Sequence, residues 1–510
     1  MKKMIRPILL TLVILVAITA AGYYFLTSRQ SGPTGEFQER IKEEQKDLGD
    51  NRAYQYDLGQ KAIPLATTGE QKNVLNFAHK VVYDVQQSNA DRERLDRLIK
   101  RSDADFENPI IALNPFGTNE NSFYFYFTTS YRCMVRYTIT VEDETIHDHV
   151  RYINNGQENN MSKTHEFVLS GLVPGTTNYI ILDLLDSTGA KRESKIYQYA
   201  TSKGSAPERI AVEQGYSKDV SNTGMFFVFP KEGTQILTYD NQGILRNVTN
   251  TESAHGKRMY QNGDSVLYQV ADHKVARVSS LGRVLGVAKV EGYGAIKDFC
   301  YDGFNEVYSL ANKKKQNYLL ATSMETGKTR VVYRFPKGVS VGSLSTPQGG
   351  QMLMTAAKPS GLICMNAITS SKPQISWVMG RKSDWKKPVG KKKVVQEKEI
   401  ITWNTSQSQI STVDNNTFSL LVEKEGKATG ICGQADTEAK SWNVIKKRAF
   451  GGNAANLFQV QGEHMILTDV TEGNYAEYDS EGKVTRKFGY GSPVDAVVKL
   501  TIEDMCFYGI

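Results

Sequence analysis

The feature that most constrains the fold is a repeat in the C-terminal half of the chain. From Gly224 onward, an apolar run, a turn with Asp or Ser, a Gly and a returning apolar run recur; the clearest copies are Ile236–Gly243, Val278–Val284, Ala321–Lys328 and Tyr478–Val484. Counting the weaker copies between them, the repeat recurs at roughly 35 to 50 residues, the length of a four-stranded propeller blade. We therefore predict a mainly β chain that ends in a six-bladed β-propeller over residues 204–510, with blades near 224–258, 259–292, 293–337, 338–380, 400–432 and 449–510.

A different β pattern precedes the propeller. Phe123–Thr128 and Met134–Val141 have the period of two that is typical of strands. Between such runs, Gly171–Tyr179 is similar to the Leu-x-Pro-Gly-Thr-x-Tyr turn of fibronectin type III sandwiches, in which Pro-Gly makes the bend and the Tyr is buried. We predict an immunoglobulin-like β-sandwich over residues 106–203.

The region ahead of the sandwich has a helical pattern. Residues 35–101 are polar, with apolar residues spaced three or four apart. These positions, which would form one stripe of a helix, are Val74, Phe77, Val81, Val82, Leu95, Leu98 and Ile99. We predict a helical stalk or helical hairpin over residues 31–105, with His79 packing beside its apolar face.

The N-terminal segment, residues 1–30, has the pattern of a membrane anchor. Lys2, Lys3 and Arg6 precede an apolar run, Pro7–Leu26. At 1.5 Å per residue such a run spans roughly 30 Å, the thickness of the hydrocarbon core of a bilayer. The preceding charges favour a cytoplasmic N-terminus, with everything after Thr27 outside the cytoplasm. A cleaved signal peptide is the alternative interpretation; the length of the run favours an uncleaved single-pass anchor.

Composition excludes several classes of function. The net charge of +7 is mild and no nucleic-acid recognition motif accompanies it, so we do not expect nucleic acid as a partner. The five cysteines lie far apart and form neither a CxxC pair nor a Cys/His cluster, which argues against a zinc site and a disulfide framework. His147 and His149 flank Asp148 in an acidic turn without an evident third ligand, so we expect solvated hairpin residues there and no metal or other cofactor.

The order of these parts resembles the bacterial aryl-sulfate sulfotransferase family. The local signatures are Gln374–Gly380, Trp403–Lys424 and a later strand pair ending near Lys487. The resemblance covers about 400 residues. It implies an immunoglobulin-like domain followed by a six-bladed propeller. Active members of the family are understood to move a sulfuryl group between phenols through a His that directly follows a Gln.

The catalytic histidines that the resemblance implies are missing. The nucleophile pair falls on Gln407-Ser408, and a His-His-Asp-Phe segment falls on Ile296–Phe299. A His-x-Asn-Ser segment falls near Ser340–Ser343, and an Arg becomes Lys358. A Phe-Asp-Asn segment becomes Leu421–Glu423. We expect the remaining propeller histidines, His255, His273 and His464, to lie in surface hairpins.

Two interpretations of Ser408 remain open. A serine nucleophile needs a base within hydrogen-bond reach, and Lys297 or Lys358 would serve only with a depressed pKa. A sulfated serine would also be a poor leaving group for onward transfer. Without chemistry, Lys297 and Lys358, with Asp298 and Gln407 beside them, are candidates for an anion-binding pocket.

A second basic feature is the segment Arg381–Lys398, which holds eight Lys or Arg residues and Trp385. It is either a solvated loop or a docking surface for an anionic polymer or lipid headgroups outside the cell.

Three functions therefore stay open. The first is a catalytically degenerate module that binds an anionic small molecule, an envelope polymer or a protein partner on the propeller face. The second is an active sulfotransferase with a relocated nucleophile, and the third is a structural component of the cell envelope.

Overall fold

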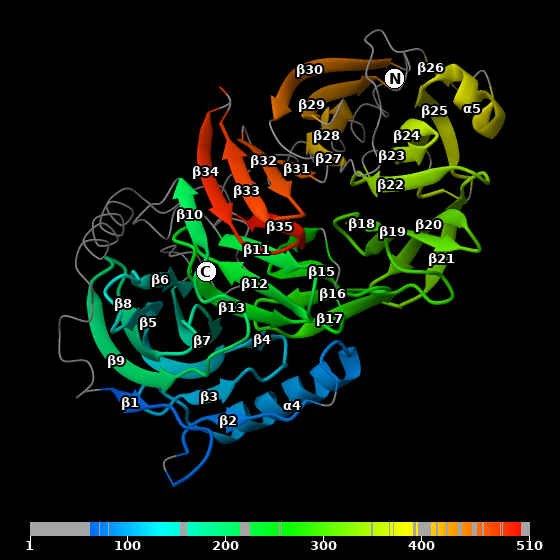
Figure 1. The fold of residues 1–510 in the computed structure, drawn as a ribbon. Coiled ribbons are helices and arrows are strands. Elements are labelled where there is room, and N and C mark those ends of the chain that lie inside the picture. The colour runs from blue at the N-terminus through cyan, green and yellow to red at the C-terminus, as the bar shows by residue number, and fades with distance from the viewer. Residues whose placement is uncertain are drawn as a thin grey trace, which may run out of the picture.

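The computed structural model describes residues 62–500, apart from 71, 80, 154–160, 215–224, 254–255, 257, 348–349, 367, 371, 391–393, 396–409, 415–416, 425–426, 437–440, 451–455, 462–463, 480 and 482. The fold is mainly β: an immunoglobulin-like sandwich is followed by sheets in a propeller-like arrangement (Figure 1).

One long strand organises the sandwich. β5 (Phe123–Val141) pairs through its first half with β3 (Ile110–Leu113) and β7 (Ser162–Leu169). Through its second half it pairs with β6 (His149–Tyr152) and β8 (Thr177–Leu185), and β8 pairs in turn with β9 (Lys191–Ala200). The strand therefore belongs to both layers of the sandwich.

The sandwich core follows from strand alternation. Phe123, Phe125 and Phe127 point to the same face of β5 and are fully buried. Phe125 stacks on Phe167 of β7 with ring centroids 5.6 Å apart. The predicted turn is also present, because Gly175 has a φ of 71° after Pro174 and Tyr179 is buried. The predicted immunoglobulin-like fold is confirmed.

The helical region predicted over residues 31–105 lies outside the described residues up to residue 61, and the prediction is wrong over the described residues of 73–83. This stretch contains the short strand β2 (Leu75–Asn76), which runs parallel to β3, while β1 (Ile63–Pro64) runs parallel to β9. Val74 and Phe77 are buried in two different apolar clusters, whereas Val81 is 50% exposed. The apolar spacing therefore reflects packing of an extended segment on the sandwich.

The predicted helix does form over its second part, as α4 (Val85–Arg101). Asp84 caps it by accepting a hydrogen bond from the Gln87 amide at 2.8 Å. Leu95 is fully buried against the sandwich, and the Ser88 hydroxyl accepts a hydrogen bond from the Val284 amide at 2.9 Å. The helix therefore packs between the sandwich and β17 (Val284–Lys289) of the propeller-like part, and it is not a free stalk (Figure 1).

Residues 211–500, where described, form six further sheets of four or five strands. Five of them are built mainly from consecutive strands. One sheet contains β14 (Met259–Asn262), β15 (Ser265–Ala271), β16 (Lys274–Ser279) and β17 (Val284–Lys289), and the next contains β18 (Asp298–Tyr301), β19 (Glu306–Lys313), β20 (Gln316–Ser323) and β21 (Thr329–Arg334). The sheets that follow contain β22 (Ser340–Leu344), β23 (Met352–Lys358), β24 (Ser360–Asn366), β25 (Gln374–Gly380) and β26 (Val394–Val395); β27 (Ile410–Asp414), β28 (Thr417–Lys424), β29 (Lys427–Asp436) and β30 (Ser441–Phe450); and β31 (Asn456–Gln461), β32 (His464–Asp469), β33 (Asn474–Tyr478) and β34 (Val484–Gly489). The first strands β18, β22, β27 and β31 contact one another in succession and lie toward the centre of the arrangement (Figure 1).

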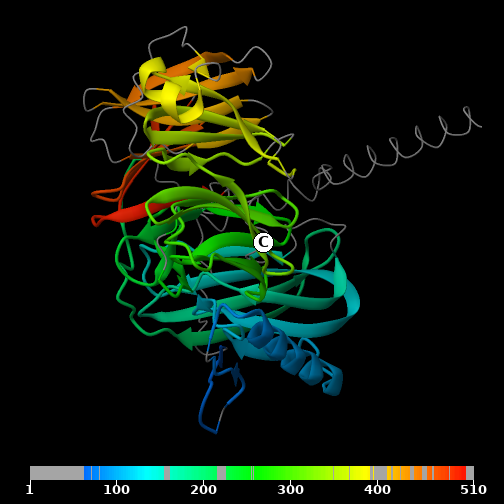
Figure 2. The same cartoon turned by 90° about the vertical axis from the view of Figure 1, so that its right-hand side faces the viewer.

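The remaining sheet, which is the first propeller sheet in chain order, joins distant parts of the chain. It contains β11 (Met225–Pro230), β12 (Gln235–Tyr239) and β13 (Leu245–Asn250), and β35 (Val494–Leu500) pairs with β11. On the other edge, β4 (Asn119–Glu120) of the sandwich region pairs with β13. The two domains thus share a sheet, and they lie stacked on each other (Figure 2).

The predicted blade limits need correction at several places. The sheet of β27–β30 continues to Phe450, whereas its blade was predicted to end at residue 432, and the sheet of β31–β34 begins only at Asn456. Val494–Leu500 belongs to the sheet of β11, and β10 (Ala211–Gln214) is added to β34. The turn motifs predicted the hairpins, but they could not predict which sheet the terminal strands β10 and β35 join.

Within the part of the chain that the structure describes, no helix is long and apolar enough to cross a membrane. The predicted span, Pro7–Leu26, lies outside the described residues.

Candidate functional site

The retained Asp of the predicted site belongs to a buried ion pair. Asp298, at the start of β18, accepts hydrogen bonds from Arg258 Nε at 2.8 Å and Arg258 Nη2 at 2.9 Å. The same Nη2 donates to Ser343 Oγ at 2.9 Å, and the Leu344 amide donates to Asp298 Oδ2 at 2.9 Å. We call Arg258, Asp298, Ser343 and Leu344 the axial network.

The axial network links three successive sheets. Arg258 directly precedes β14, Asp298 opens β18, and Ser343 and Leu344 end β22. Burial disfavours the charged form of Arg258, but the adjacent Asp298 carboxylate outweighs this effect and raises the guanidinium pKa. A bidentate pair of this kind fixes the inner strands relative to one another, and a role of Asp298 in holding an anion stays a prediction.

The two candidate lysines lie at the same end of neighbouring sheets. Lys297 is half-buried and donates from Nζ to Asn317 Oδ1 at 2.9 Å, and burial lowers its pKa. Asn317 donates to the carbonyl of Val339, the residue before Ser340, and Ser340 pairs with Lys358 across β22 and β23. Lys358 itself is exposed. An anion pocket between Lys297 and Lys358 stays a prediction.

Gln407 and Ser408, the predicted nucleophile pair, lie outside the described residues. Of the propeller histidines, His255 also lies outside them, and His464 begins β32. His273 lies in the exposed turn between β15 and β16, as predicted. Leu421–Glu423 lies in the middle of β28.

The basic segment contains a short helix, α5 (Lys382–Val389), held by Trp385. The indole is fully buried and donates from Nε1 to the Ser360 carbonyl at 3.0 Å. A Cβ at Gly380 would lie 2.6 Å from that nitrogen, so glycine is needed for the indole to fit. Trp385 therefore anchors α5 to the sheet. Four cations at this helix are exposed to solvent, and we call them the α5 cationic cluster: Arg381, Lys382, Lys386 and Lys387.

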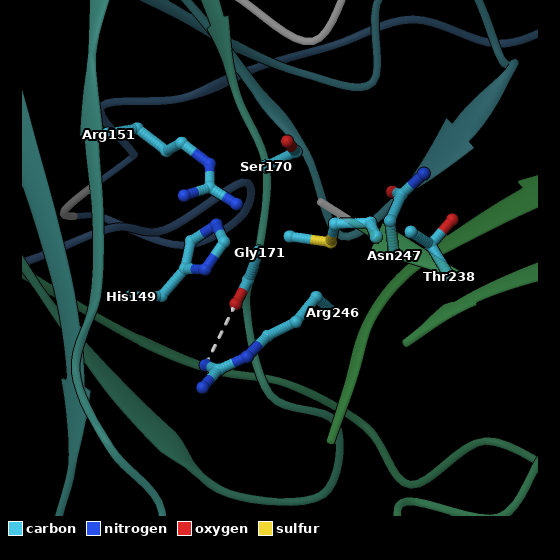
Figure 3. Close-up of a pocket in the computed structure, with 8 residues that line it drawn as sticks. His149, Arg151, Ser170, Gly171, Thr238, Arg246 and Asn247 are labelled. Carbon is cyan, nitrogen blue, oxygen red and sulfur yellow. Dashed lines mark hydrogen bonds between the residues drawn. The ribbon is translucent and has the colours of Figure 1, made fainter. Parts of the chain in front are cut away.

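A cavity lies where the sandwich meets the first propeller sheet (Figure 3). Its lining residues are His149, Arg151, Ser170 and Gly171 from the sandwich and Met225, Thr238, Arg246 and Asn247 from β11, β12 and β13. His149 is buried, so its predicted solvated position in a hairpin is wrong. The available signal was the alternation along β6, which directs His149 and Arg151 to one face.

The packing around His149 is tight. Gly171 has a φ of 106°, and a Cβ there would lie 2.4 Å from Cδ2 of the imidazole. Burial, and then the charges of Arg151 and Arg246, hold the pKa of His149 well below its usual value, so the imidazole is neutral at neutral pH. Among the described residues, no group of three or more His, Cys, Asp or Glu side chains is placed to hold a metal ion.

Comparison with known proteins identifies the sandwich. Residues 110–202 match the model of the arylsulfotransferase Ig-like domain. This part of the chain therefore belongs to that family of domains, and the resemblance to arylsulfotransferases is confirmed there. No curated protein matches the sequence.

Several solved structures match at low identity and low TM-score. A nidogen/laminin complex matches with 10% identity and a TM-score of 0.37, over 54% of this chain and 97% of that chain. A protein of unknown function from Bacteroides caccae matches with 12% identity and a TM-score of 0.38, over 54% and 98%. A putative 6-phosphogluconolactonase from Bacteroides fragilis matches with 10% identity and a TM-score of 0.35, over 72% and 98%. Similarity at this level implies nothing about fold or function.

Proposed function

We propose that this chain is a membrane-anchored, extracytoplasmic binding protein with an arylsulfotransferase-like architecture, and that it does not transfer sulfuryl groups. Its sheets would close into a six-bladed propeller whose broad faces receive the partner. The single observation that carries the proposal is the axial network, in which the one polar residue kept from the expected catalytic segment is fully used in a buried ion pair.

Sulfuryl transfer needs a nucleophile and free cations around the sulfate oxygens. At the corresponding positions, Ile296 is an apolar residue that is 5% exposed, and Lys297 is engaged with Asn317. Asp298 neutralises Arg258, and Arg258 therefore has little charge to offer an oxyanion. These side chains support a structural role for the inner strands.

The α5 cationic cluster supplies the binding surface in this proposal. Four exposed cations surround a single acidic residue, Asp384, on a helix that Trp385 holds in place. A fixed array of cations attracts a polyanion more strongly than the same charges on a free loop, because less side-chain and backbone freedom is lost on binding. The partner class is an anionic polymer of the cell envelope.

The catalytic part of the proposal is tested with the full chain in detergent, a chromogenic aryl sulfate and a phenol acceptor. We expect no acceptor-dependent release of phenolate above the uncatalysed rate. Release that depends on the acceptor and is lost in Ser408→Ala would contradict the proposal and establish an active sulfotransferase with a serine nucleophile.

The binding part is tested with dextran sulfate as a model polyanion. The triple variant Lys382→Gln, Lys386→Gln, Lys387→Gln should bind at least about tenfold more weakly at low salt, since three cation contacts are lost. A matched control replaces three exposed lysines elsewhere, Lys231, Lys337 and Lys372, with Gln and changes the net charge equally. Equal weakening in both variants would show that only net charge matters and would reject α5 as the site.

A further inference from the structure

We propose that the cavity between the sandwich and the first propeller sheet is a binding site for a small monovalent anion, of which chloride is the physiological example. This site is separate from the α5 cationic cluster and does not depend on the proposed binding function. Its lining residues come from both domains (Figure 3).

The charges around the cavity do not balance. Arg151 is 3% exposed, and burial lowers its pKa to about 10, so it stays charged at neutral pH. Arg246, the second guanidinium of the lining, is paired with Asp240 at 2.7 Å. Asp240 is also the carboxylate that favours the charged form of Arg151, so two cations share one carboxylate. A buried charge without compensation is costly, and an anion removes that cost.

The lining also presents hydrogen-bond donors that have no protein partner. Arg151 donates from Nη1 to the Val150 carbonyl at 3.0 Å, but its buried Nη2 bonds to nothing in the protein. The buried hydroxyl of Thr238, on the propeller side, also has no partner. His149 lies between Arg151 and Arg246 and, being neutral, can donate one N–H without adding charge (Figure 3).

Size restricts the ligand to a single small ion. The space open to the centre of a water molecule is about 10 Å³, which is roughly the room for one water-sized species. A tetrahedral oxyanion such as sulfate or phosphate does not fit. A water molecule would fit and would also satisfy the unpartnered Oδ1 of Asn247, but it would leave the excess positive charge in place.

An anion here would connect the two domains. Arg246 of β13 already donates to the His147 carbonyl at 2.9 Å and to the Gly171 carbonyl at 3.5 Å, both in the sandwich. An anion beside Arg151 of the sandwich would lie in the same cavity as Arg246 of the propeller-like part and would compensate charge at this boundary. Chloride would therefore strengthen the docking of the sandwich on the propeller-like part.

The test uses the full chain in detergent, with thermal unfolding followed in sodium chloride and in sodium gluconate at matched ionic strength. We expect Tm to be higher in chloride by about 2 °C. Arg151→Met should abolish the difference, because it removes the charge while keeping a long apolar side chain. Arg97→Met, which removes an exposed arginine of α4, is the control and should retain it.

Crystals grown with sodium bromide give a second measurement that needs no variant. An anomalous peak beside Arg151 in the cavity would support the site. A peak with the density of water and no anomalous signal, or a Tm that is equal in chloride and gluconate, would overturn the proposal.

Discussion

Arg258 in the propeller-like part and Arg151 in the sandwich are both buried, but they differ in their partners. Arg258 has a bidentate carboxylate, a hydroxyl acceptor and a tyrosine hydroxyl around its guanidinium. Arg151 donates a hydrogen bond to one carbonyl. The carboxylate that favours its charge, Asp240, is already paired with Arg246. A paired buried charge fixes neighbouring strands, whereas an incompletely paired one indicates a place for a ligand.

The largest expected effect is the loss of the carboxylate of the axial network. Asp298→Asn should lower the free energy of unfolding by about 3–5 kcal/mol, because Arg258 is left charged and buried. Urea unfolding measures the change. Glu93→Gln, which breaks an exposed pair with Arg97 on α4, should cost under about 1 kcal/mol. Similar small costs in both variants would mean that the axial network does not stabilise the inner strands.

The second effect concerns the glycine against the cavity histidine. Gly171 and Gly233 have φ of 106° and 107°, but a Cβ meets the His149 ring only at Gly171 and nothing within 4 Å at Gly233. Gly233→Ala should cost about 1–3 kcal/mol from backbone strain. Gly171→Ala should cost about 1–3 kcal/mol more, because the added methyl overpacks the site. Equal changes in the urea midpoint would show that the imidazole yields freely.

A third effect is the pH dependence of stability that buried histidines produce. The pKa of His149 lies well below its usual value, and burial lowers that of His165 to about 4. Because the unfolded chain takes up these protons near pH 6.5, stability falls as the pH drops below that value, by up to about 1.4 kcal/mol per unit for each group.

The variants separate the two histidines. His149→Gln should reduce the slope of stability against pH below about pH 6.5, and His165→Gln should reduce it between about pH 6.5 and pH 4. Urea unfolding across this pH range measures both slopes. An unchanged slope in His149→Gln would mean that the imidazole is already protonated between its two arginines.

The smallest expected effect returns to Arg151. In chloride-free buffer, Arg151→Met should change the free energy of unfolding by about 1 kcal/mol or less, because the lost charge was poorly compensated. Arg258→Met, the matched substitution, should cost about 3–5 kcal/mol by leaving Asp298 buried without its cation. Equal costs in urea unfolding would show that Arg151 is as well paired as Arg258.

Local patterns predicted much of the fold. The alternation of Phe123, Phe125 and Phe127 indicated a strand of the sandwich, and strand–turn–Gly repeats indicated the hairpins of the propeller-like part. The helix over residues 73–83 was wrong because Val74 and Phe77 are buried by an extended segment against the sandwich, which produces the same spacing as a helix.

Long-range relations were beyond such patterns. The sequence could suggest that Asp298 matters, but not that Arg258 from the preceding sheet would pair with it. The cavity forms where residues of β6, the loop after β7, β12 and β13 come together. No local sequence pattern relates His149 to Thr238 or Arg246. Residues that act together across domains are defined by the docking of the domains.

The pairing of β35 with β11 has a consequence for how the chain is made. During synthesis the sandwich has all its described strands once residue 200 has emerged, but the edge of β11 stays open until residues 494–500 arrive to cover it. An open strand edge is a template for pairing with other chains. A chain interrupted before residue 494 would therefore carry a folded sandwich next to an aggregation-prone edge, and quality control during synthesis would have to recognise it by that edge.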